Sequence, residues 1–570
     1  MGTENSGGYL RSKGISLSYN YLLLLISILL CTVSVLSIFQ SLITKNYNND
    51  LDQFMYFGQR LLEGEIAYIR EYDDKSIVLS AIFSLPAAFK SIKLWTSISI
   101  LVSLIATYRI FKELKIYIRC QTQFSVNTSG YLSMLGSSLF LFTLATTPYN
   151  FNQVNNFSAS LIALIISYYL NQNTKSNSYK LTFIAFSLIG AIAISIRPYL
   201  ILPVSLIGSW IGLRTYLTVG INPKIMNFDN GLKSILTCTL KWNSLLATWL
   251  FILNVLPYIL LNKFKDLIAG LNIMSIEYVS ESSSQTIVTQ ILTAHKSPLL
   301  FVLLIASLII GIKFIIGNIF KVINQLFKNN LYPNIFSIVY IDYLFLAVVF
   351  PISLEYMFLR RHFFDHYFSL FSPFTCIAIS LLLAYIMKVH QNIKLDTFHF
   401  KNNNLVIILM LCTIGLCFAF SASELKENLI GDVKSSITNR YSKQEMLKDI
   451  ESIVNTRIPR YSFLVTQNNL AHWKLNESRH GFPHAAVFGR ISRKSKSFQE
   501  IYKIKTLNDS SFLMPKTEEM CSTLLINAPE ITFVPPDSSE QRCLDKYPRE
   551  FIKVKAKNKN ITSYKRRDAK

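Results

Sequence analysis

A short polar stretch between the first two long apolar runs contains residues that can accept protons and bind polar ligands. It reads Asn48-Asn49-Asp50-Leu51-Asp52-Gln53-Phe54-Met55-Tyr56, and Gly64, Tyr68, Asp73, Asp74 and Lys75 follow it. Carboxylates are common general bases. Acidic side chains at the boundary of a bilayer are costly to hold there, so they indicate a site. The alternative is a solvated loop in which the aspartates cap a helix, and charge alone leaves both interpretations open.

Arginines occur at two other polar interruptions of the apolar sequence. The first reads Ile196-Arg197-Pro198-Tyr199, and the second, from Glu355 to Tyr367, contains Arg360 and Arg361. The planar guanidinium makes paired, charge-assisted hydrogen bonds to phosphate, so these residues could bind a phosphate at a membrane surface. The alternatives are a boundary arginine whose head reaches water for Arg197, and interfacial anchoring for the pair.

Two histidines follow the arginine pair. His362 and His366 are four residues apart with Asp365 between them, a spacing that can bind a metal ion. Histidines at the end of a helix in an aromatic run are more often hydrogen-bonded parts of the structure. We therefore predict no metal at this position.

The elements that carry these clusters are membrane-spanning helices. The chain has 570 residues, of which 51% are hydrophobic and 16% charged, and its apolar residues form runs close to the length that spans a bilayer. The runs lie at 20–43, 92–111, 130–147, 154–171, 181–197, 199–216, 243–261, 298–319, 335–354, 367–387 and 404–422. About eleven transmembrane helices are predicted, because backbone within lipid must form helices or a closed barrel.

The distribution of charged residues predicts how these helices are oriented across the membrane. The net charge is +23, with Lys and Arg spread between the apolar runs, which argues against nucleic-acid binding and favours membrane lipids and phosphate-bearing substrates. The Lys and Arg bias puts residues 1–19 in the cytoplasm. An odd number of spans then puts residues 44–91, the first outer loop, and everything after residue 423 outside. Within that loop, Ile77–Phe89 is too short to cross and is predicted to be re-entrant or interfacial.

A separate domain follows the last span. Residues 424–570 are polar, and Tyr461–Val465 and Ile531–Val534 have the composition of strands, whereas Lys443–Asn455 reads as an amphipathic helix. A small extracytoplasmic α/β domain is predicted, with a loose basic end at Lys553–Lys570. Cys521 and Cys543 are the only cysteines in this part, so a disulfide between them is predicted if it lies outside the cell.

The order of these motifs resembles the GT-C membrane glycosyltransferases, in particular their bacterial protein O-mannosyltransferase-like and aminoarabinose-transferase-like branch. The resemblance covers about residues 1–425 in architecture. It is carried by a few degenerate motifs, namely Asp50, Gln53, Phe54, Tyr56, Leu61-Leu62-Glu63-Gly64-Glu65, Tyr68, Asp74, Lys75, Arg197-Pro198, His366, Tyr367 and Pro373.

The resemblance implies transfer of a sugar from a polyprenyl-phosphate carrier to a glycan, lipid or protein acceptor on the outer face of the plasma membrane, with inversion at the sugar. Asp50, or else Asp52, would be the base, because the acceptor hydroxyl must lose a proton. The leaving phosphate needs cations. The residues expected to bind the donor phosphate are Arg197, Arg360, Arg361 and Lys75. The residues expected to contact the substrates are Gln53, Tyr56, Tyr68, Asp74, Asn150, Asn152, His362, His366 and Tyr367.

Two positions depart from the family pattern. Ser76 follows Lys75 where the family often has proline, and the second outer loop, Thr147–Asn156, has amides and no carboxylate. Hard cations prefer anionic oxygens, so no divalent metal cofactor is expected. Asn150 and Asn152 could instead bind sugar hydroxyls, or cap helices and form turns.

Two other functions stay open. A polymerase or ligase of lipid-linked oligosaccharides would share the outer arginines, but its large outer loop would lie between spans rather than at the C-terminus. A transporter would show inverted repeats or broken helices in matching halves, which the sequence does not show.

Overall fold

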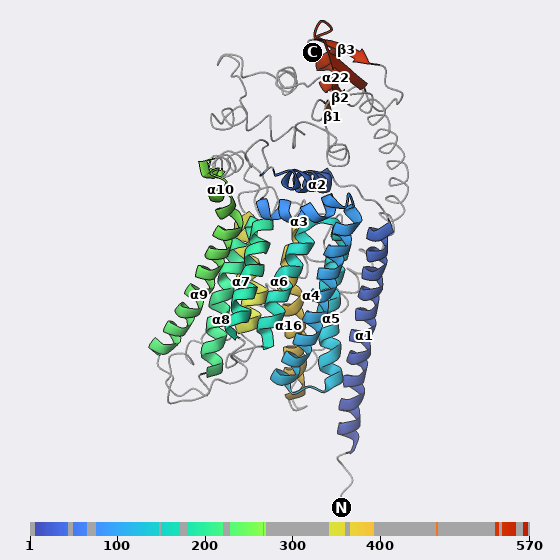
Figure 1. The fold of residues 1–570 in the computed structure, drawn as a ribbon. Helices are drawn as coiled ribbons and strands as arrows, with labels where there is room; N and C mark the ends of the chain where they lie inside the picture. Colours follow the sequence, from blue (N-terminus) through green and yellow to red (C-terminus); the bar gives the residue numbers. More distant parts are fainter. Residues whose placement is uncertain are drawn as a thin grey trace, which may run out of the picture. The chain divides into compact units, whose positions relative to one another are not determined.

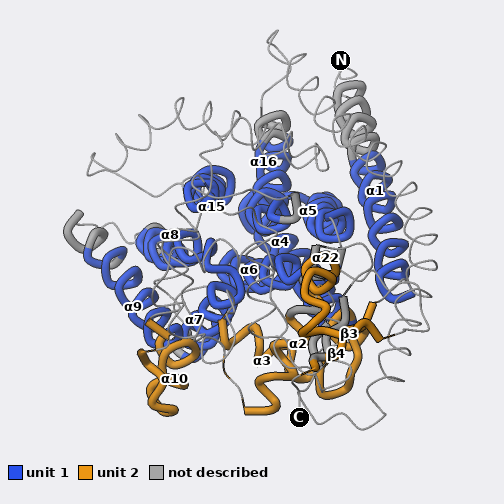
Figure 2. The backbone as a smooth tube through the Cα atoms, turned by 90° about the horizontal axis from the view of Figure 1, so that it is seen from above, with its two compact units in different colours: residues 1–43, 97–250, 284–429 blue, residues 44–96, 251–283, 430–570 orange. Residues whose placement is uncertain are grey.

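The computed structural model describes residues 6–43, 49–64, 66, 76–147, 150–171, 179–219, 228–265, 267–268, 341–358, 365–392, 463–465, 531–534, 539–554 and 562–567. Two compact units divide the chain (Figure 2). The first comprises residues 1–43, 97–250 and 284–429, and the second comprises 44–96, 251–283 and 430–570.

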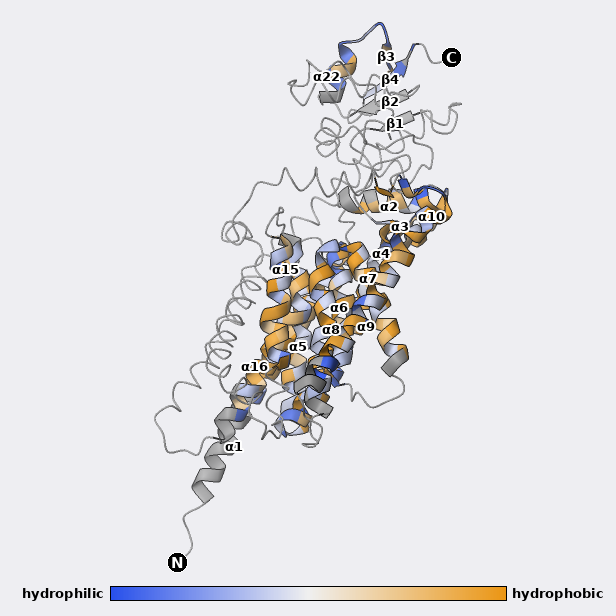
Figure 3. Ribbon diagram, turned by 90° about the vertical axis from the view of Figure 1, so that its left-hand side faces the viewer, coloured by the Kyte–Doolittle hydropathy of each residue, from blue (hydrophilic) through white to orange (hydrophobic). Residues whose placement is uncertain are grey.

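The first unit is a bundle of helices with hydrophobic residues along most of their length (Figures 1 and 3). Its elements are α1 (Ser6–Ile43), α4 (Ile92–Thr122), α5 (Val126–Thr146), η1 (Asn150–Asn152), α6 (Val154–Asn171), α7 (Tyr179–Ile196), η2 (Pro198–Leu200), α8 (Ile201–Val219), α9 (Phe228–Asn254), η4 (Phe345–Val349), α15 (Phe350–Phe358), η5 (Asp365–Phe371) and α16 (Ser372–Asn392). The first residues of α4, 92–96, and the last residues of α9, 251–254, belong to the second unit.

Six of the described helices are long and apolar enough to cross a bilayer. The prediction of a helical, polytopic membrane domain is confirmed, and the chain is an integral membrane protein. Described helices cover all or part of each predicted run except 298–319 and 404–422, which lie outside the described residues. The total of about eleven spans therefore stays a prediction.

The predicted run 20–43 coincides with the candidate span Asn20–Ile43, and the helix that contains it, α1, begins earlier, at Ser6. A second predicted run differs from the structure. The run predicted at 243–261 is two helices, since α9 starts at Phe228 and ends at Asn254, and α10 (Leu256–Leu260) follows. Pro257 explains this break, because proline lacks the amide hydrogen of a helix interior and its ring clashes with the preceding turn.

The bundle has two ends, which we name after a residue at each. The Arg197 end holds the end of α5, the start of α6, the end of α7, the start of α8, the end of α15 and the start of α16. The Asp342 end holds the opposite termini and the end of α4. Helices α1 and α5 run in parallel between them, because Cys31 lies 3.2 Å from the Ser138 hydroxyl and Ser37 donates to the Ala145 carbonyl at 2.8 Å.

Glycines bring α8 and α9 into close contact. A Cβ atom on Gly208 would lie 2.7 Å from the Cβ of Trp242, and one on Gly212 would lie 2.8 Å from the Cα of Ile235. The two glycines are four residues apart, which is the spacing that lets helix backbones approach in membranes. Trp242 donates its indole N–H to the Val204 carbonyl at 2.8 Å across the same contact.

Replacing Gly212 with Leu is expected to lower the stability of the protein by about 1–3 kcal/mol, because the added atoms overlap the backbone of α9. Thermal unfolding of the purified protein in detergent measures the loss. Gly130→Ala is the matched control, since its Cβ would meet only the Lys115 side chain, at 3.9 Å. Equal unfolding temperatures for Gly212→Leu and the control would contradict the close contact.

Helices α2 (Asn49–Leu62) and α3 (Ile77–Ala88) pack against each other in the second unit. Phe83 contacts Phe54 and Trp95, with ring centroids 5.3 and 4.4 Å away. A Cβ on Gly58 would lie 2.8 Å from the Ser84 nitrogen and closer still to the Phe83 carbonyl, so α2 and α3 touch through their backbones. Helix α3 has 12 residues, about 18 Å, which is shorter than the roughly 30 Å of a bilayer core and agrees with the prediction.

Gly64, which belongs to the family-like motif, and Ser76, which departs from it, cap these helices. Gly64 has φ +82°, a left-handed conformation that glycine adopts without strain, and its N–H bonds to the Leu61 carbonyl at 3.0 Å. Ser76 is the N-cap of α3 and accepts a hydrogen bond from the Leu79 N–H at 3.3 Å. Serine in place of the family's proline therefore still provides a helix start.

A four-stranded sheet forms the described part of the C-terminal domain, together with α22 (Ser539–Asp545). Its order is β1-β2-β4-β3, and β1 (Phe463–Val465) pairs in parallel with β2 (Ile531–Val534). The predicted strands are thus confirmed, as is a small C-terminal domain that contains both strands and a helix. The amphipathic helix predicted at Lys443–Asn455 lies outside the described residues.

The prediction of a loose basic end at Lys553–Lys570 is wrong. There β4 (Thr562–Arg566) pairs with both β2 and β3 (Phe551–Val554). Tyr564 is buried in it and donates a hydrogen bond to Asp545 at 2.5 Å. Burial and this bond raise the pKa of Tyr564. One buried tyrosine thus anchors this strand. The lysine and arginine residues around it make the segment look like a polar tail in the sequence.

Candidate functional site

Arg197 is a buried cation at the end of α7. Its side chain is only 8% exposed, and among the described residues it has no hydrogen bond or ion pair, including none at Nε. Pro198 disfavours a helical conformation of the preceding residue, so Arg197 is extended, with φ −135° and ψ 92°, and α7 ends there. Burying an unpaired cation costs several kcal/mol, so binding of an anion at this position would be favourable.

The antiparallel pair α6 and α7 sets the neighbours of Arg197. Gly190 lies beside Ile165, and the rings of Phe186 and Tyr168 are 4.4 Å apart. Continuing this pairing places Arg197 at the level of Ser158 on α6. Helix α6 therefore presents its first two turns to the arginine.

The first turns of α6, together with Gln153 just before the helix, are unusually polar for a buried segment. Ser158 and Gln153 are 0% and 3% exposed, and neither the Ser158 hydroxyl nor the Gln153 Nε2 has a partner within the described residues. Asn156 donates to the Leu144 carbonyl at 2.8 Å. Buried polar groups are nearly always hydrogen-bonded, so unpaired donors close to a buried guanidinium suggest a place for a ligand.

Three aromatic rings lie beside this polar group. Tyr199 follows Arg197 by two residues, and its ring centroid is 4.8 Å from that of Phe358 and 5.5 Å from that of Tyr367. Phe358 and Tyr367 stack at 5.1 Å. The rings tie the ends of α7 and α15 to the start of η5. Together with Arg197, Gln153 and Ser158 they form what we call the Arg197 site.

Glu355 is a carboxylate at the same end of the bundle. It lies on α15 one turn before Phe358 and is partly buried. No other residue that the structure describes forms a hydrogen bond or ion pair with it. A negative group near the rings could bind a hydroxyl or amine of a substrate.

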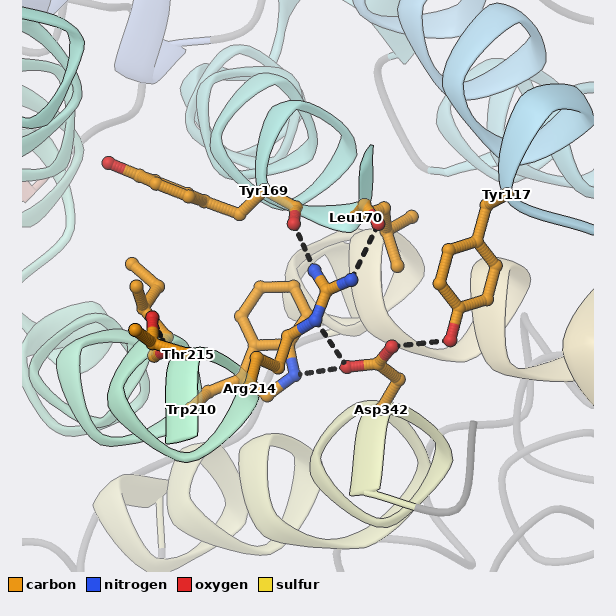
Figure 4. A network of polar contacts seen from close by, with 8 residues as sticks. Tyr117, Tyr169, Leu170, Trp210, Arg214, Thr215 and Asp342 are labelled. Atoms are coloured by element: carbon orange, nitrogen blue, oxygen red, sulfur yellow. Dashed lines mark hydrogen bonds and ion pairs between the residues drawn. The ribbon is translucent and has the colours of Figure 1, made fainter. Parts of the chain in front are cut away.

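A second polar network lies at the Asp342 end (Figure 4). Asp342 is fully buried and forms an ion pair with Arg214 at 3.1 Å. It accepts hydrogen bonds from the Trp210 indole at 2.8 Å and from the Tyr117 hydroxyl at 2.5 Å. Arg214 also donates to the carbonyls of Tyr169 and Leu170. Because each charge has partners, this network joins helices rather than offering a site.

No family model matches the chain, and no curated protein sequence matches it. Several solved structures are similar to it. One is ArnT from Cupriavidus metallidurans bound to undecaprenyl phosphate, with a TM-score of 0.47 and 10% identity over 94% of this chain and 97% of the other. The second is the archaeal oligosaccharyltransferase AglB from Archaeoglobus fulgidus in complex with an inhibitory peptide and a dolichol-phosphate, with a TM-score of 0.46 and 8% identity over 90% of this chain and 69% of the other. At these identities and scores they give no residue-by-residue correspondence.

The predicted catalytic residues lie on α2. Asp50 and Asp52 are in its first turn and Gln53 follows, so the expected helix is present. Tyr56 is 4% exposed, and its hydroxyl accepts a hydrogen bond from Arg60 at 3.0 Å. Arg60 in turn pairs with Glu63 at 3.0 Å. Tyr56 therefore has a structural partner, whereas the roles of the aspartates stay predictions.

The side chains of two other predicted residues are described. Tyr367 is 7% exposed and belongs to the ring cluster of the Arg197 site, and Asn152, the last residue of η1, is 6% exposed. Asn150 and His366 lie in η1 and η5, but their side chains are outside the described part of the structure. Residues wholly outside it are Tyr68, Asp74, Lys75, Arg360, Arg361, His362 and Cys521. Cys543 is disulfide-bonded, but its partner lies outside the described residues. Its pairing with Cys521 therefore stays a prediction.

Sequence reasoning missed Ser158 and Asp342, and it included Gln153 only as one of the amides of the loop Thr147–Asn156. Asp342 had a readable signal, because a single acidic residue inside an apolar run is expected to face a partner. Ser158 had none, since serines are frequent in the apolar runs of this chain. No cluster of three or more His, Cys, Asp or Glu that could hold a metal occurs among the described residues.

Proposed function

We propose that the protein is a membrane glycosyltransferase that moves a sugar from a polyprenyl-phosphate carrier to a glycan, lipid or protein acceptor. The observation that carries the proposal is Arg197, a buried cation without a partner among the described residues of a membrane bundle. A lipid phosphate supplies the missing anion, and the bilayer delivers such a lipid to the end of a helix bundle. The order of the motifs in the sequence indicates the class of donor, a polyprenyl-phosphate sugar.

Each element of the Arg197 site has a role in this reaction. The guanidinium binds the phosphate and stabilises its charge as the sugar leaves. Gln153 and Ser158 donate hydrogen bonds to phosphate or sugar oxygens. Tyr199 and Tyr367 offer ring faces and hydroxyls, which suit a sugar because such rings have an apolar face and a polar tip.

The remaining roles follow the sequence. Asp50, with Asp52 as the alternative, accepts the proton of the acceptor hydroxyl as its oxygen bonds to the anomeric carbon and the bond from that carbon to the lipid phosphate breaks. This single displacement inverts the anomeric centre. Lys75, Arg360 and Arg361 add positive charge for the phosphate. Gln53, Tyr68, Asp74, Asn150, Asn152, His362 and His366 contact the substrates. The reaction takes place on the outer face of the plasma membrane, where the C-terminal domain also lies.

Arg197→Lys tests the proposal. It keeps the charge and removes the fork, so the KM for the donor is expected to rise at least about tenfold, since one hydrogen bond to a charged group is worth roughly 1.5–3 kcal/mol. Consumption of a polyprenyl-phosphate sugar by the purified protein in detergent provides the measurement. A wild-type protein that binds this donor without consuming it would be a transporter.

Arg197→Met separates binding from folding. Donor use should disappear, and the unfolding temperature without ligand should stay equal or rise, because the substitution removes an uncompensated buried charge. Arg119→Met is the control, since Arg119 is exposed near the other end of the bundle. Unchanged donor kinetics in both Arg197 variants would contradict a role in donor binding. Arg197 would then be a boundary arginine whose head group is hydrated at the membrane surface.

A further inference from the structure

A crevice opens between α4 and α16 at the Asp342 end of the bundle. Its floor is apolar and buried: Tyr117, Ile118, Leu381 and Ala384 line it and are each at most 2% exposed. The crevice is partly open, so a segment of one chain could lie along it without being enclosed.

The mouth of this crevice is polar and positively charged. Gln121, Thr122, Tyr385 and Lys388 form it, and all four are partly exposed. The Lys388 ammonium donates a hydrogen bond to the Gln121 carbonyl in the last turn of α4, at 2.9 Å, which joins the two helices at the mouth. Polarity therefore increases from the floor to the mouth.

The depth of the crevice in the membrane follows from its helices. The apolar span of α16 ends at Tyr385, three residues before Lys388, so the mouth is expected at the headgroup level. The floor residues Leu381 and Ala384 lie within that span. Lys388 is the one cation among the residues that line the crevice. Basic pockets between membrane helices attract anionic headgroups, with about 1 kcal/mol for each Lys or Arg near the surface.

We propose that this crevice binds one anionic phospholipid of the leaflet at the Asp342 end, predicted to be the cytoplasmic one. Its phosphate lies at Lys388 and a segment of one acyl chain lies against Leu381 and Tyr385. This lipid is distinct from the sugar donor and lies at the other end of the bundle from Arg197. The crevice does not depend on the proposed function.

The lipid has a structural effect through the floor of the crevice. The ring of Tyr117 lines the crevice, and its hydroxyl donates to Asp342. A bound chain packs on that ring and excludes water from the Arg214–Asp342 pair behind it. Anionic lipid should therefore stabilise the bundle as well as bind to it.

Native mass spectrometry of the delipidated protein in detergent, with added dioleoyl phosphatidylglycerol or dioleoyl phosphatidylcholine, tests the proposal. The wild type should retain one phosphatidylglycerol about fivefold more strongly than phosphatidylcholine, as expected for one cation at the surface. Lys388→Gln should abolish this preference, whereas Lys388→Arg should keep it. Ala384→Leu should lower retention of both lipids, because it fills the floor.

Lys233→Gln is the matched control, since Lys233 is an exposed lysine of α9 outside the crevice. Thermal unfolding of each variant without lipid identifies any that are misfolded, and Ala384→Val then replaces Ala384→Leu. Equal retention of the two lipids by the wild type would overturn the proposal. So would competition by glycerol phosphate as strong as that by the lipid, which would indicate a site for free phosphate.

Discussion

Replacing Asp50 with Asn should lower the rate of sugar transfer by at least ~10²-fold, the usual contribution of a general base. The amide keeps the shape of the side chain and cannot accept the proton of the acceptor hydroxyl. Because the substitution removes no phosphate contact, the KM for the donor should change little. Initial rates at saturating donor separate this effect from that of Arg197→Lys, which acts on the donor.

Asp52→Asn is the decisive comparison. The two aspartates are two residues apart in the first turn of α2, so their side chains are expected to point about 200° from each other, and one cleft cannot take both. We expect Asp50 to be the base, from its position three residues before Gln53. A dead Asp52→Asn with an active Asp50→Asn would reverse the assignment, and two active variants would remove α2 from the chemistry.

Glu63→Gln is the control on the same helix. Glu63 pairs with Arg60, and glutamine keeps an oxygen that can accept a hydrogen bond from that arginine. Its activity should stay near that of the wild type. A loss as large as that of Asp50→Asn would show that any change of charge on α2 inactivates the protein, so the Asp50 result would then not identify a base.

Asp342→Ala should destabilise the protein by about 3–5 kcal/mol, because it leaves Arg214 charged and buried without its partner. Tyr117 and Trp210 lose an acceptor in the same substitution. Arg214→Met should cost a similar amount, since Asp342 is then the unpaired charge. Thermal unfolding in detergent measures both.

The double variant Asp342→Leu with Arg214→Met gives the sharper result. Replacing a whole buried ion pair by apolar side chains is often neutral or stabilising, so the double variant should be more stable than either single one. Two single variants within about 0.5 kcal/mol of the wild type would contradict a buried pair. Additive losses in the double variant would show that the two residues act separately.

The sequence allowed prediction of elements whose signals are local. The apolar runs predicted helices, Gly64 and Ser76 stand where a helix ends and another begins, and the two strand-like segments pair as expected. Arg197 was found in the sequence because it interrupts an apolar run next to proline. Its lack of a partner could not be read there, since that depends on which residues α6 and α15 bring near it.

Features that depend on packing between distant segments were missed. Asp342 meets Tyr117 across 225 residues and Trp210 across 132, and no periodicity links such positions. Ser158 and Gln153 are ordinary residues in the sequence and become notable only because they are buried without partners. Strand β4 was missed because lysine and arginine surround the single buried tyrosine.

The π-helix η4 (Phe345–Val349) lies between Asp342, which pairs with Arg214, and Phe358, which stacks on Tyr367. A π-turn takes up one residue more than an α-turn over nearly the same rotation, so the extra residue is absorbed within this segment. The same residues in a regular α-helix would rotate its two ends by about 100° relative to each other, and either the ion pair or the ring stack would then face the wrong way. In evolution this segment should therefore accept loss of its one extra residue, which restores a regular α-helix in the same phase, while rejecting a single-residue deletion in the regular turns that flank it.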